Sequence, residues 1–190
     1  DVQVFLVRRD EYFDRSGLYG ADGRAYEDNA ERYIFFSKAV VDLAKRIQPA
    51  PDIIHAHDWQ AGLAAVYLKS VYAAHPLLAR TPSVFTIHNM AYQGLFEPDW
   101  LPRLDLPWSL LSVEALEFWG KISFLKGGIN GADVITTVSP QYAKEIQTPE
   151  FGCGFDGVLR RRSNEPAAIR PDGGDLLPAD WSLAMALRST

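Results

Sequence analysis

The side chains best suited to chemistry in this 190-residue chain stand where short apolar runs end. Two imidazoles and a carboxylate lie at the end of the run Ile53–Ala56, and an imidazole and an amide follow Ile87. A hydroxyl follows Val138. Imidazoles and carboxylates can transfer protons or stabilise charge, and amides and hydroxyls can hydrogen-bond a ligand. The candidates are His55, His57, Asp58, His88, Asn89, Tyr92, Gln93, Ser139 and Tyr142.

Each candidate also has a purely structural interpretation. His55 is still within its apolar run and could form a hydrogen bond inside the core. Asp58 could cap the helix that follows, because a carboxylate at a helix start accepts backbone N–H bonds. His88 and Asn89 could form an ordinary turn. The sequence by itself leaves these alternatives open.

A metal-dependent hydrolase is a further interpretation, because His55 and His57 alternate at a strand end and could share one metal ion. Such a site needs more ligands at later strand ends, where only His88 and His75 remain and no carboxylate is found. Ser139 lacks the G-x-S-x-G context of a nucleophilic serine, and no phosphate-binding glycine spacing occurs. We therefore expect no metal ion.

The apolar runs predict buried strands, and the segments between them show the three- and four-residue apolar spacing of helices. Because strands and helices alternate, we expect a Rossmann-like α/β fold with a parallel sheet covered on both faces. Ligands bind at the carboxyl edge of such a sheet, so the candidate residues should meet in one cleft. The predicted strands are 2–7, 53–56, 83–88 and 133–138; the predicted helices are 28–48, 61–72, 109–119, 121–130 and 140–147; the predicted loops are 8–25 and 89–107.

Composition excludes some classes of partner. The net charge of −5 argues against a nucleic-acid-binding surface, and no apolar run is long enough to span a membrane. The single cysteine, Cys153, cannot form an internal disulfide and suits a reducing compartment. We expect a cytoplasmic location in a bacterium, or a plastid in a plant or alga. The oligomeric state is left open.

Five motifs, in order across about residues 1–162, resemble those of glycogen and starch synthases. The first combines residues 14–20 (DRSGLYG) with residues 26–29 and Arg32. The others are PDIIHAHDWQAGL at 51–63, FTIHNMAYQG at 85–94, KISFLKGG at 121–128 and TTVSPQYAKEI at 136–146.

This resemblance implies a GT-B glycosyltransferase, in which two Rossmann-like domains face a cleft. It implies retaining transfer of glucose from ADP-glucose to the non-reducing end of an α-1,4-glucan, with no cofactor and no metal ion. By position, His88 and Asp58 would be catalytic, with His88 stabilising positive charge on the donor glucose. The substrate-binding residues would be Tyr19, His57, Asn89, Tyr92, Gln93 and Ser139.

The resemblance also marks where the pattern stops. We expect residues 1–162 to be a partial amino-terminal, acceptor-side domain that is truncated at both ends, and residues 163–190 to be an irregular tail with a weak helix at 180–188. Without the groups that grip the diphosphate, the isolated chain should be inactive. An alternative is a non-catalytic glucan-binding module that uses Trp59, Tyr92 and Trp100 as sugar platforms.

Overall fold

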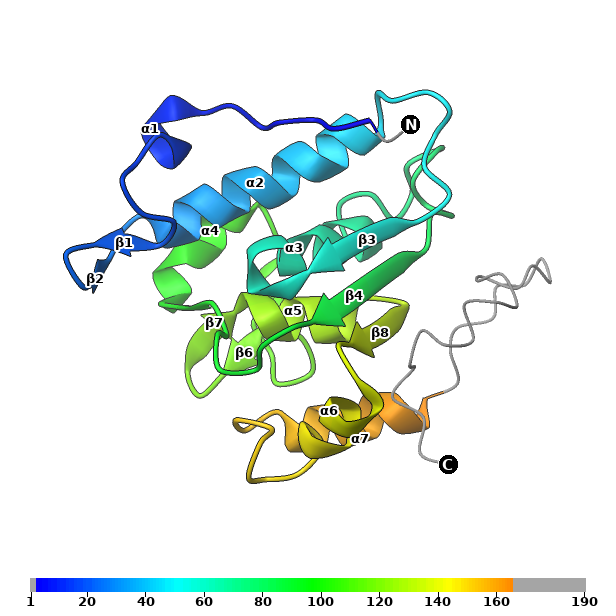
Figure 1. Ribbon diagram of the computed structural model, residues 1–190. Coiled ribbons are helices and arrows are strands. Elements are labelled where there is room, and N and C mark those ends of the chain that lie inside the picture. Colours follow the sequence, from blue (N-terminus) through cyan, green and yellow to red (C-terminus); the bar gives the residue numbers. More distant parts are fainter. Residues whose placement is uncertain (1–2, 166–190) are drawn as a thin grey trace.

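The computed structural model describes residues 3–165, and a parallel three-stranded sheet lies at its centre (Figure 1). The strands are β3 (Ile54–His57), β4 (Ser83–Ile87) and β8 (Val134–Thr137), in the order β3-β4-β8. His57 pairs with Thr86, and Ile87 pairs with Thr137. The carboxyl ends of the three strands therefore share one edge, as predicted.

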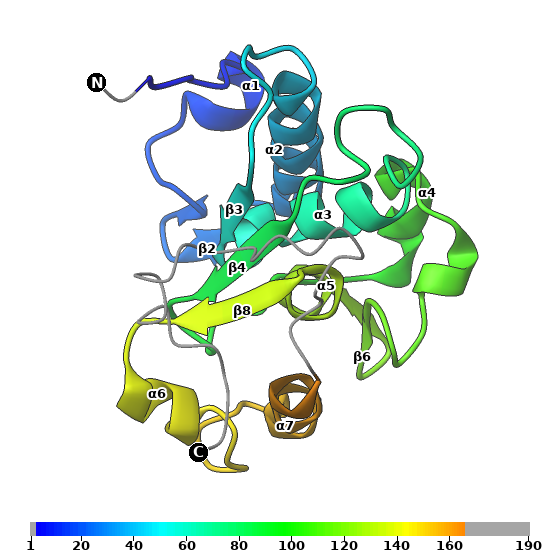
Figure 2. The same cartoon turned by 90° about the vertical axis from the view of Figure 1, so that its right-hand side faces the viewer.

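Helices cover one face of this sheet (Figure 2). The helix α3 (Asp58–Lys69) packs between α2 (Asn29–Ala44) and α5 (Phe124–Gly131) and also contacts β3 and β4. Glycines allow this close approach: a Cβ at Gly62 would lie 2.1 Å from the carbonyl oxygen of Phe124. A Cβ at Gly128 would lie 2.4 Å from the ring of Phe85, which is fully buried on β4.

The opposite face of the sheet is polar along β3. His55 and His57 point to this side and are exposed, whereas Ile54 and Ala56 are buried. The side chains of one strand point alternately to opposite faces of a sheet. Within the described part of the chain the second face is therefore open along β3, whereas β4 is buried on both faces, so the predicted double cover is found at β4 but not at β3.

The segment that follows β4, residues 89–123, folds differently from the prediction. The loop 89–107 contains β5 (Leu95–Phe96), a 3₁₀ turn and a short helix. The predicted helix 109–119 is wrong: the segment has a 3₁₀ turn at its start, bends and turns over 111–116, and a short strand near its end. Phe118 and Ile122 are buried on opposite sides of a reversal at Trp119, whose φ is +52°. The elements are η1 (Pro98–Trp100), α4 (Leu101–Leu104), η2 (Trp108–Leu110), β6 (Glu117–Phe118) and β7 (Lys121–Ser123), and the antiparallel sheet order is β5-β7-β6.

The amino-terminal segment does not form the predicted strand. Residues 3–7 pair with no strand in the structure, and the side chains of Val4 and Leu6 are 76% and 88% exposed. An apolar run needs a neighbouring strand before it can complete its backbone hydrogen bonds, and the sequence of the run does not supply one. The predicted loop 8–25 contains α1 (Asp10–Phe13), β1 (Gly20–Ala21) and β2 (Arg24–Ala25).

Two helices close the described chain, α6 (Pro140–Glu145) and α7 (Asp156–Asn164). The predicted domain boundary after Arg162 falls inside α7, and the helix predicted at 180–188 lies outside the described residues. None of the helices in residues 3–165 is long and apolar enough to cross a membrane.

Candidate functional site

Asp58 joins the ends of β3 and β4. It is the first residue of α3, and its Oδ1 accepts a 2.7 Å hydrogen bond from the backbone N–H of His88. No side chain caps α3, so the capping interpretation of Asp58 was wrong. The φ of Asp58 is +53°, in the left-handed region that residues other than glycine seldom adopt. Such backbone strain persists where surrounding contacts hold it, as they commonly do in functional sites.

Three histidines form a row along this edge. The ring centroids of His55 and His57 are 4.2 Å apart, and those of His57 and His88 are 5.2 Å apart. His57 Nδ1 and His88 Nε2 share a 3.0 Å hydrogen bond, in which one nitrogen must accept and therefore carries no proton. The pair consequently holds at most one positive charge while this bond exists.

Burial and mutual repulsion disfavour protonation of His55 and His57. Burial lowers the pKa of His57, the His88 imidazole lowers it further, and the Asp58 carboxylate opposes the shift. Burial also lowers the pKa of His55, with smaller contributions from His57 and His88. His55 Nε2 lies 2.6 Å from Thr86 Oγ1, which lies 2.6 Å from Thr136 Oγ1. The structural interpretation of His55 is thus confirmed in part, because it hydrogen-bonds across the sheet from an exposed position.

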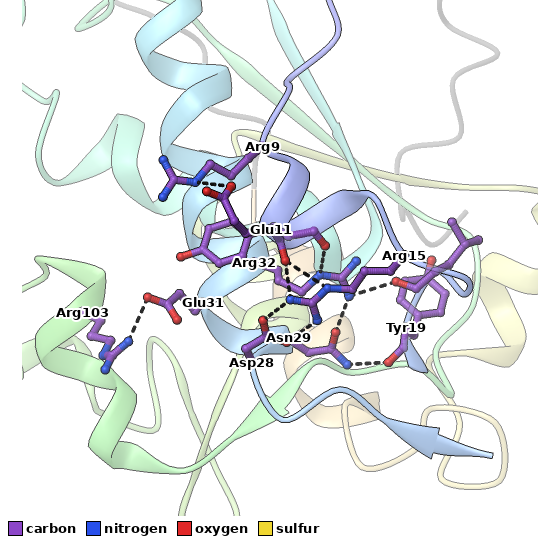
Figure 3. A network of polar contacts seen from close by, with 11 residues as sticks. Arg9, Glu11, Arg15, Tyr19, Asp28, Asn29, Glu31, Arg32 and Arg103 are labelled. Atoms are coloured by element: carbon purple, nitrogen blue, oxygen red, sulfur yellow. Dashed lines mark hydrogen bonds and ion pairs between the residues drawn. The ribbon is translucent and has the colours of Figure 1, made fainter. Parts of the chain in front are cut away.

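Tyr19 reaches the site from the amino-terminal loop and is held at both ends. Its hydroxyl accepts a 2.6 Å bond from Gln60 Nε2, and its carbonyl accepts a 2.8 Å bond from Asn29 Nδ2. The loop itself is fastened by Arg32, which is 2% exposed and donates to Leu18 O and Tyr12 O (Figure 3). The loop position of Tyr19 therefore depends on a buried polar network that begins on α2.

An ion pair shown in Figure 3 also stabilises this loop. The guanidinium of Arg15 donates to both carboxylate oxygens of Asp28, at 2.8 Å and 2.5 Å. This contact lowers the pKa of Asp28. Asp28 precedes α2 but its side chain makes no helix cap, because it is committed to Arg15.

A cavity of about 910 Å³ connects these parts. Its lining includes four of the predicted site residues, on β3, α3, the end of β4 and the amino-terminal loop. Arg15 and Arg32 also line it, but both guanidinium groups are bound within the loop network. The predicted site residues in the lining are Tyr19, His57, Asp58 and His88.

The other predicted binding residues lie on the loop after β4, outside that lining. Asn89 is exposed, and its Oδ1 accepts from Ala91 N at 2.9 Å, as an ordinary turn would. Tyr92 is 63% exposed. Gln93 is fixed by its side chain, whose Nε2 donates to Cys153 O at 2.9 Å.

Ser139 serves mainly as a helix cap. Its Oγ accepts a 3.0 Å bond from Tyr142 N at the start of α6. Tyr142 in turn uses its hydroxyl to accept from Met90 N at 3.0 Å. The residue after β8 that touches the β4 loop is therefore Tyr142, and Ser139 acts through the helix that carries it.

Sequence reasoning missed two supports of the site, Gln60 and Arg32. Gln60 lies within the recognised strand-and-turn motif, but its contact with Tyr19 spans 41 positions of the chain. Arg32 was noted only as part of a motif, and its burial among Phe13, Tyr26 and Tyr33 depends on loop folding. The sequence does hold one signal for the burial of Arg32, because this arginine lies among apolar positions of a predicted helix.

Two alternatives lose support from this geometry. In residues 3–165 no group of three or more His, Cys, Asp or Glu side chains is arranged to hold a metal ion. Trp59 was suggested as a sugar platform, but it is 7% exposed and packs against Tyr33 with ring centroids 4.6 Å apart. The indole of Trp59 therefore belongs to the core.

Comparison with known proteins decides the family. A family model described as the starch synthase catalytic domain matches residues 1–161. This chain belongs to that family. This chain is 51% identical over 181 residues to a glycogen synthase of Koribacter versatilis, and the match covers 95% of this chain and 37% of the relative. It is 43% identical over 193 residues to one of Opitutus terrae, covering 97% and 40%.

A solved structure agrees with the sequence comparison. The catalytic domain of starch synthase IV from Arabidopsis thaliana, bound to ADP and acarbose, superposes with a TM-score of 0.67 at 32% identity. The match covers 73% of the present chain and 29% of the Arabidopsis chain. The expected fold class, a Rossmann-like part of a GT-B glycosyltransferase, is confirmed. The chain spans about two fifths of the length of the first curated relatives.

Proposed function

We propose that this chain is the acceptor-side part of an enzyme that transfers glucose from ADP-glucose to the non-reducing end of an α-1,4-glucan. The observation that carries the proposal is that Asp58, His57 and His88 lie together at one sheet edge and line the cavity. A 2.7 Å hydrogen bond joins Asp58 to His88, and a 3.0 Å hydrogen bond joins His57 to His88. Family membership supports the reaction class, and the ADP and acarbose bound to the Arabidopsis enzyme support the substrate classes.

The geometry suggests a division of roles. Asp58 fixes the backbone of His88, so the His88 imidazole and carbonyl are presented at the strand end without freedom to swing away. A preorganised imidazole and a carbonyl dipole can stabilise the positive charge that develops on a sugar ring as its leaving group departs. His57 orients the His88 ring, and Tyr19 lines the same cavity.

A chimera tests this proposal. Residues 1–161 would replace the matched segment of the Koribacter versatilis glycogen synthase, and glucose transfer from labelled ADP-glucose to maltoheptaose would be measured. We expect transfer by the chimera and a loss of roughly 100-fold in kcat for His88→Ala. The matched control is His75→Ala, at a histidine remote from the strand ends. Equal transfer by the His88→Ala and His75→Ala chimeras would contradict the assignment.

The isolated chain should not transfer glucose. Both arginines that line the cavity are engaged by Asp28 or by backbone carbonyls, and diphosphate departure needs cationic neutralisation. We therefore propose that cationic groups elsewhere in the whole enzyme complete the site. Transfer by the isolated chain above that of its His88→Ala variant would contradict this view. We also propose a cytoplasmic location, because Cys153 is a free, exposed thiol and the similar glycogen synthases of Koribacter versatilis and Opitutus terrae are bacterial.

A non-catalytic glucan-binding module is the second candidate, favoured by the 63% exposure of Tyr92. It predicts binding of the chain to glycogen that Tyr92→Ala abolishes and that ADP-glucose leaves unchanged. An inactive chimera combined with such binding would favour the module over the enzyme.

A further inference from the structure

Trp119 is the most exposed large aromatic side chain in residues 3–165, at 84%. It occupies the first position of the two-residue turn between β6 and β7, because Phe118 pairs with Lys121. The φ values of Trp119 and Gly120 are +52° and +78°. A hairpin turn with positive φ at both positions favours Asn, Asp or Gly at the first of them. The turn alone therefore gives no reason for a tryptophan, and its exposure gives no packing reason.

The hairpin that carries Trp119 is held rigidly. Glu117 Oε1 accepts a 2.7 Å bond from Gly120 N across the turn. The ring of Phe118 stacks on that of Phe155, with centroids 4.1 Å apart and planes 8° apart. The hairpin thereby contacts the residue that directly precedes α7. The exposed indole is thus presented on a fixed support.

This support is continuous with the predicted acceptor loop. Gln93 Nε2 donates to Cys153 O, and a Cβ on the next residue, Gly154, would lie 3.5 Å from Trp119 Nε1. The backbone of Gln93 is fixed as well, because its carbonyl accepts from Leu125 N at 3.2 Å. Tyr92, adjacent to Gln93, is 63% exposed. An exposed path therefore runs from the end of β4 across Tyr92 and Cys153 to Trp119.

We propose that Trp119 binds α-1,4-glucan at a position further along the acceptor than the site at His88. This inference rests on the proposed function. Glucan is uncharged and each glucose unit has an apolar face, which a rigid, exposed aromatic ring can cover while peptide and amide groups bind the hydroxyls. Polar groups lie on the path toward Trp119: the Gln93 amide donates to the carbonyl of Cys153, and the next residue, Gly154, approaches the indole.

The hairpin and its support bury Phe118 and Phe155 and leave the indole of Trp119 outward, and Phe151 of the same supporting segment is 48% exposed. Exposed aromatic rings on a rigid support can cover the apolar faces of glucose units. The site would sense chain length, because a short acceptor that fills the positions near His88 does not reach Trp119.

The test is calorimetric titration of the whole chain with maltotriose and with maltoheptaose. Trp119→Asn removes the ring and introduces a residue that the turn favours, so its fold should be retained. We expect this variant to bind maltoheptaose about tenfold more weakly, a change of about 1.4 kcal/mol, and to bind maltotriose unchanged. Trp119→Tyr keeps an aromatic face and should stay within about threefold of the wild type.

The matched control is Trp108→Ala, which removes another exposed tryptophan, 63% exposed on η2. It should leave both affinities unchanged. Wild-type affinity of Trp119→Asn for maltoheptaose overturns the inference and leaves the proposed function standing, and so does equal weakening by Trp108→Ala. If the wild-type chain binds neither oligosaccharide, the acceptor role in the proposed function fails, and this inference fails with it.

Discussion

At the residue scale, Asp58 combines a backbone task with a chemical one. Its left-handed φ lets the chain turn from β3 into α3, and its carboxylate accepts from His88 N. Aspartate and asparagine tolerate this backbone region better than other residues with a Cβ, because short polar side chains hydrogen-bond locally. A substitution at Asp58 can therefore remove the charge of the site while keeping the hydrogen bond that stabilises the local backbone.

Substitution of Asp58 should separate them. Asp58→Asn keeps an acceptor for His88 N and should change the free energy of unfolding by less than about 1 kcal/mol. Asp58→Ala loses the acceptor and strains the left-handed backbone, and should cost about 2–3 kcal/mol. Urea denaturation of both variants and of Asp52→Ala, an exposed neighbour, measures this. Equal stability of the Asn and Ala variants would show that the Asp58–His88 bond contributes nothing.

The histidine row makes stability depend on pH. Histidine has a pKa of about 6.5 in an unfolded chain, and burial lowers the pKa of His55 and His57 in the folded chain. The unfolded state therefore takes up protons first as the pH falls, so stability is lost from about pH 6.5 downward until the folded pKa values are passed. Thermal unfolding at pH 7.5 and 5.0 should show a decrease in Tm.

His57→Gln should make that decrease smaller, because glutamine keeps a polar side chain but does not titrate. His75→Gln is the control, since His75 lies outside the row. A wild-type decrease that His57→Gln leaves at full size would mean that the row does not govern this pH range.

At the scale of elements, the site depends on how closely α3 and α5 approach the sheet. Gly62 and Gly128 allow helix backbone to meet Phe124 O and the Phe85 ring at distances that a Cβ would violate. The recognised motifs contain both glycines, so family resemblance and packing agree. The position of Asp58 at the start of α3 follows from this packing.

Gly128→Ala should therefore be destabilising. Its Cβ would lie 2.4 Å from the fully buried Phe85 ring, and overpacking of a core costs about 1–3 kcal/mol. Gly157→Ala is the matched control on α7, where a Cβ would meet nothing within 4 Å. That control should be neutral or stabilise by up to about 1 kcal/mol through helix propensity. Equal free energies of unfolding for the two variants would refute the packing argument.

At the scale of the whole molecule, both edge strands of the parallel sheet, β3 and β8, lack an outer partner strand within residues 3–165. β3 pairs only with β4, and the exposed residues Val4, Phe5 and Leu6 lie in the segment beside the cavity. Unpaired strand edges and exposed apolar segments promote association between copies. The isolated chain therefore carries a surface that favours self-association.

Sedimentation velocity at about 5 μM and 200 μM should detect this association as a rise in average mass. The double variant Val4→Lys/Leu6→Lys should reduce it, because charge on an exposed segment opposes edge pairing. Arg24→Lys, on the exposed strand β2, is a control that keeps the charge elsewhere. If the chain is a monomer at both concentrations, the unpaired strand edge and the exposed segment do not cause self-association.

The sequence by itself determined the three parallel strands, the helices between them and the placement of candidate residues at the strands' carboxyl ends, because these depend on apolar periodicity and on short motifs. Tertiary structure decided what apolar character cannot express: residues 3–7 have no partner strand, a hairpin turn at Trp119 stands where a helix was predicted, and Trp59 lies in the core. It also decided the contacts of Tyr19 with Gln60 and of Gln93 with Cys153. Those contacts join residues 41 and 60 positions apart, and such distances along the chain are closed only by packing.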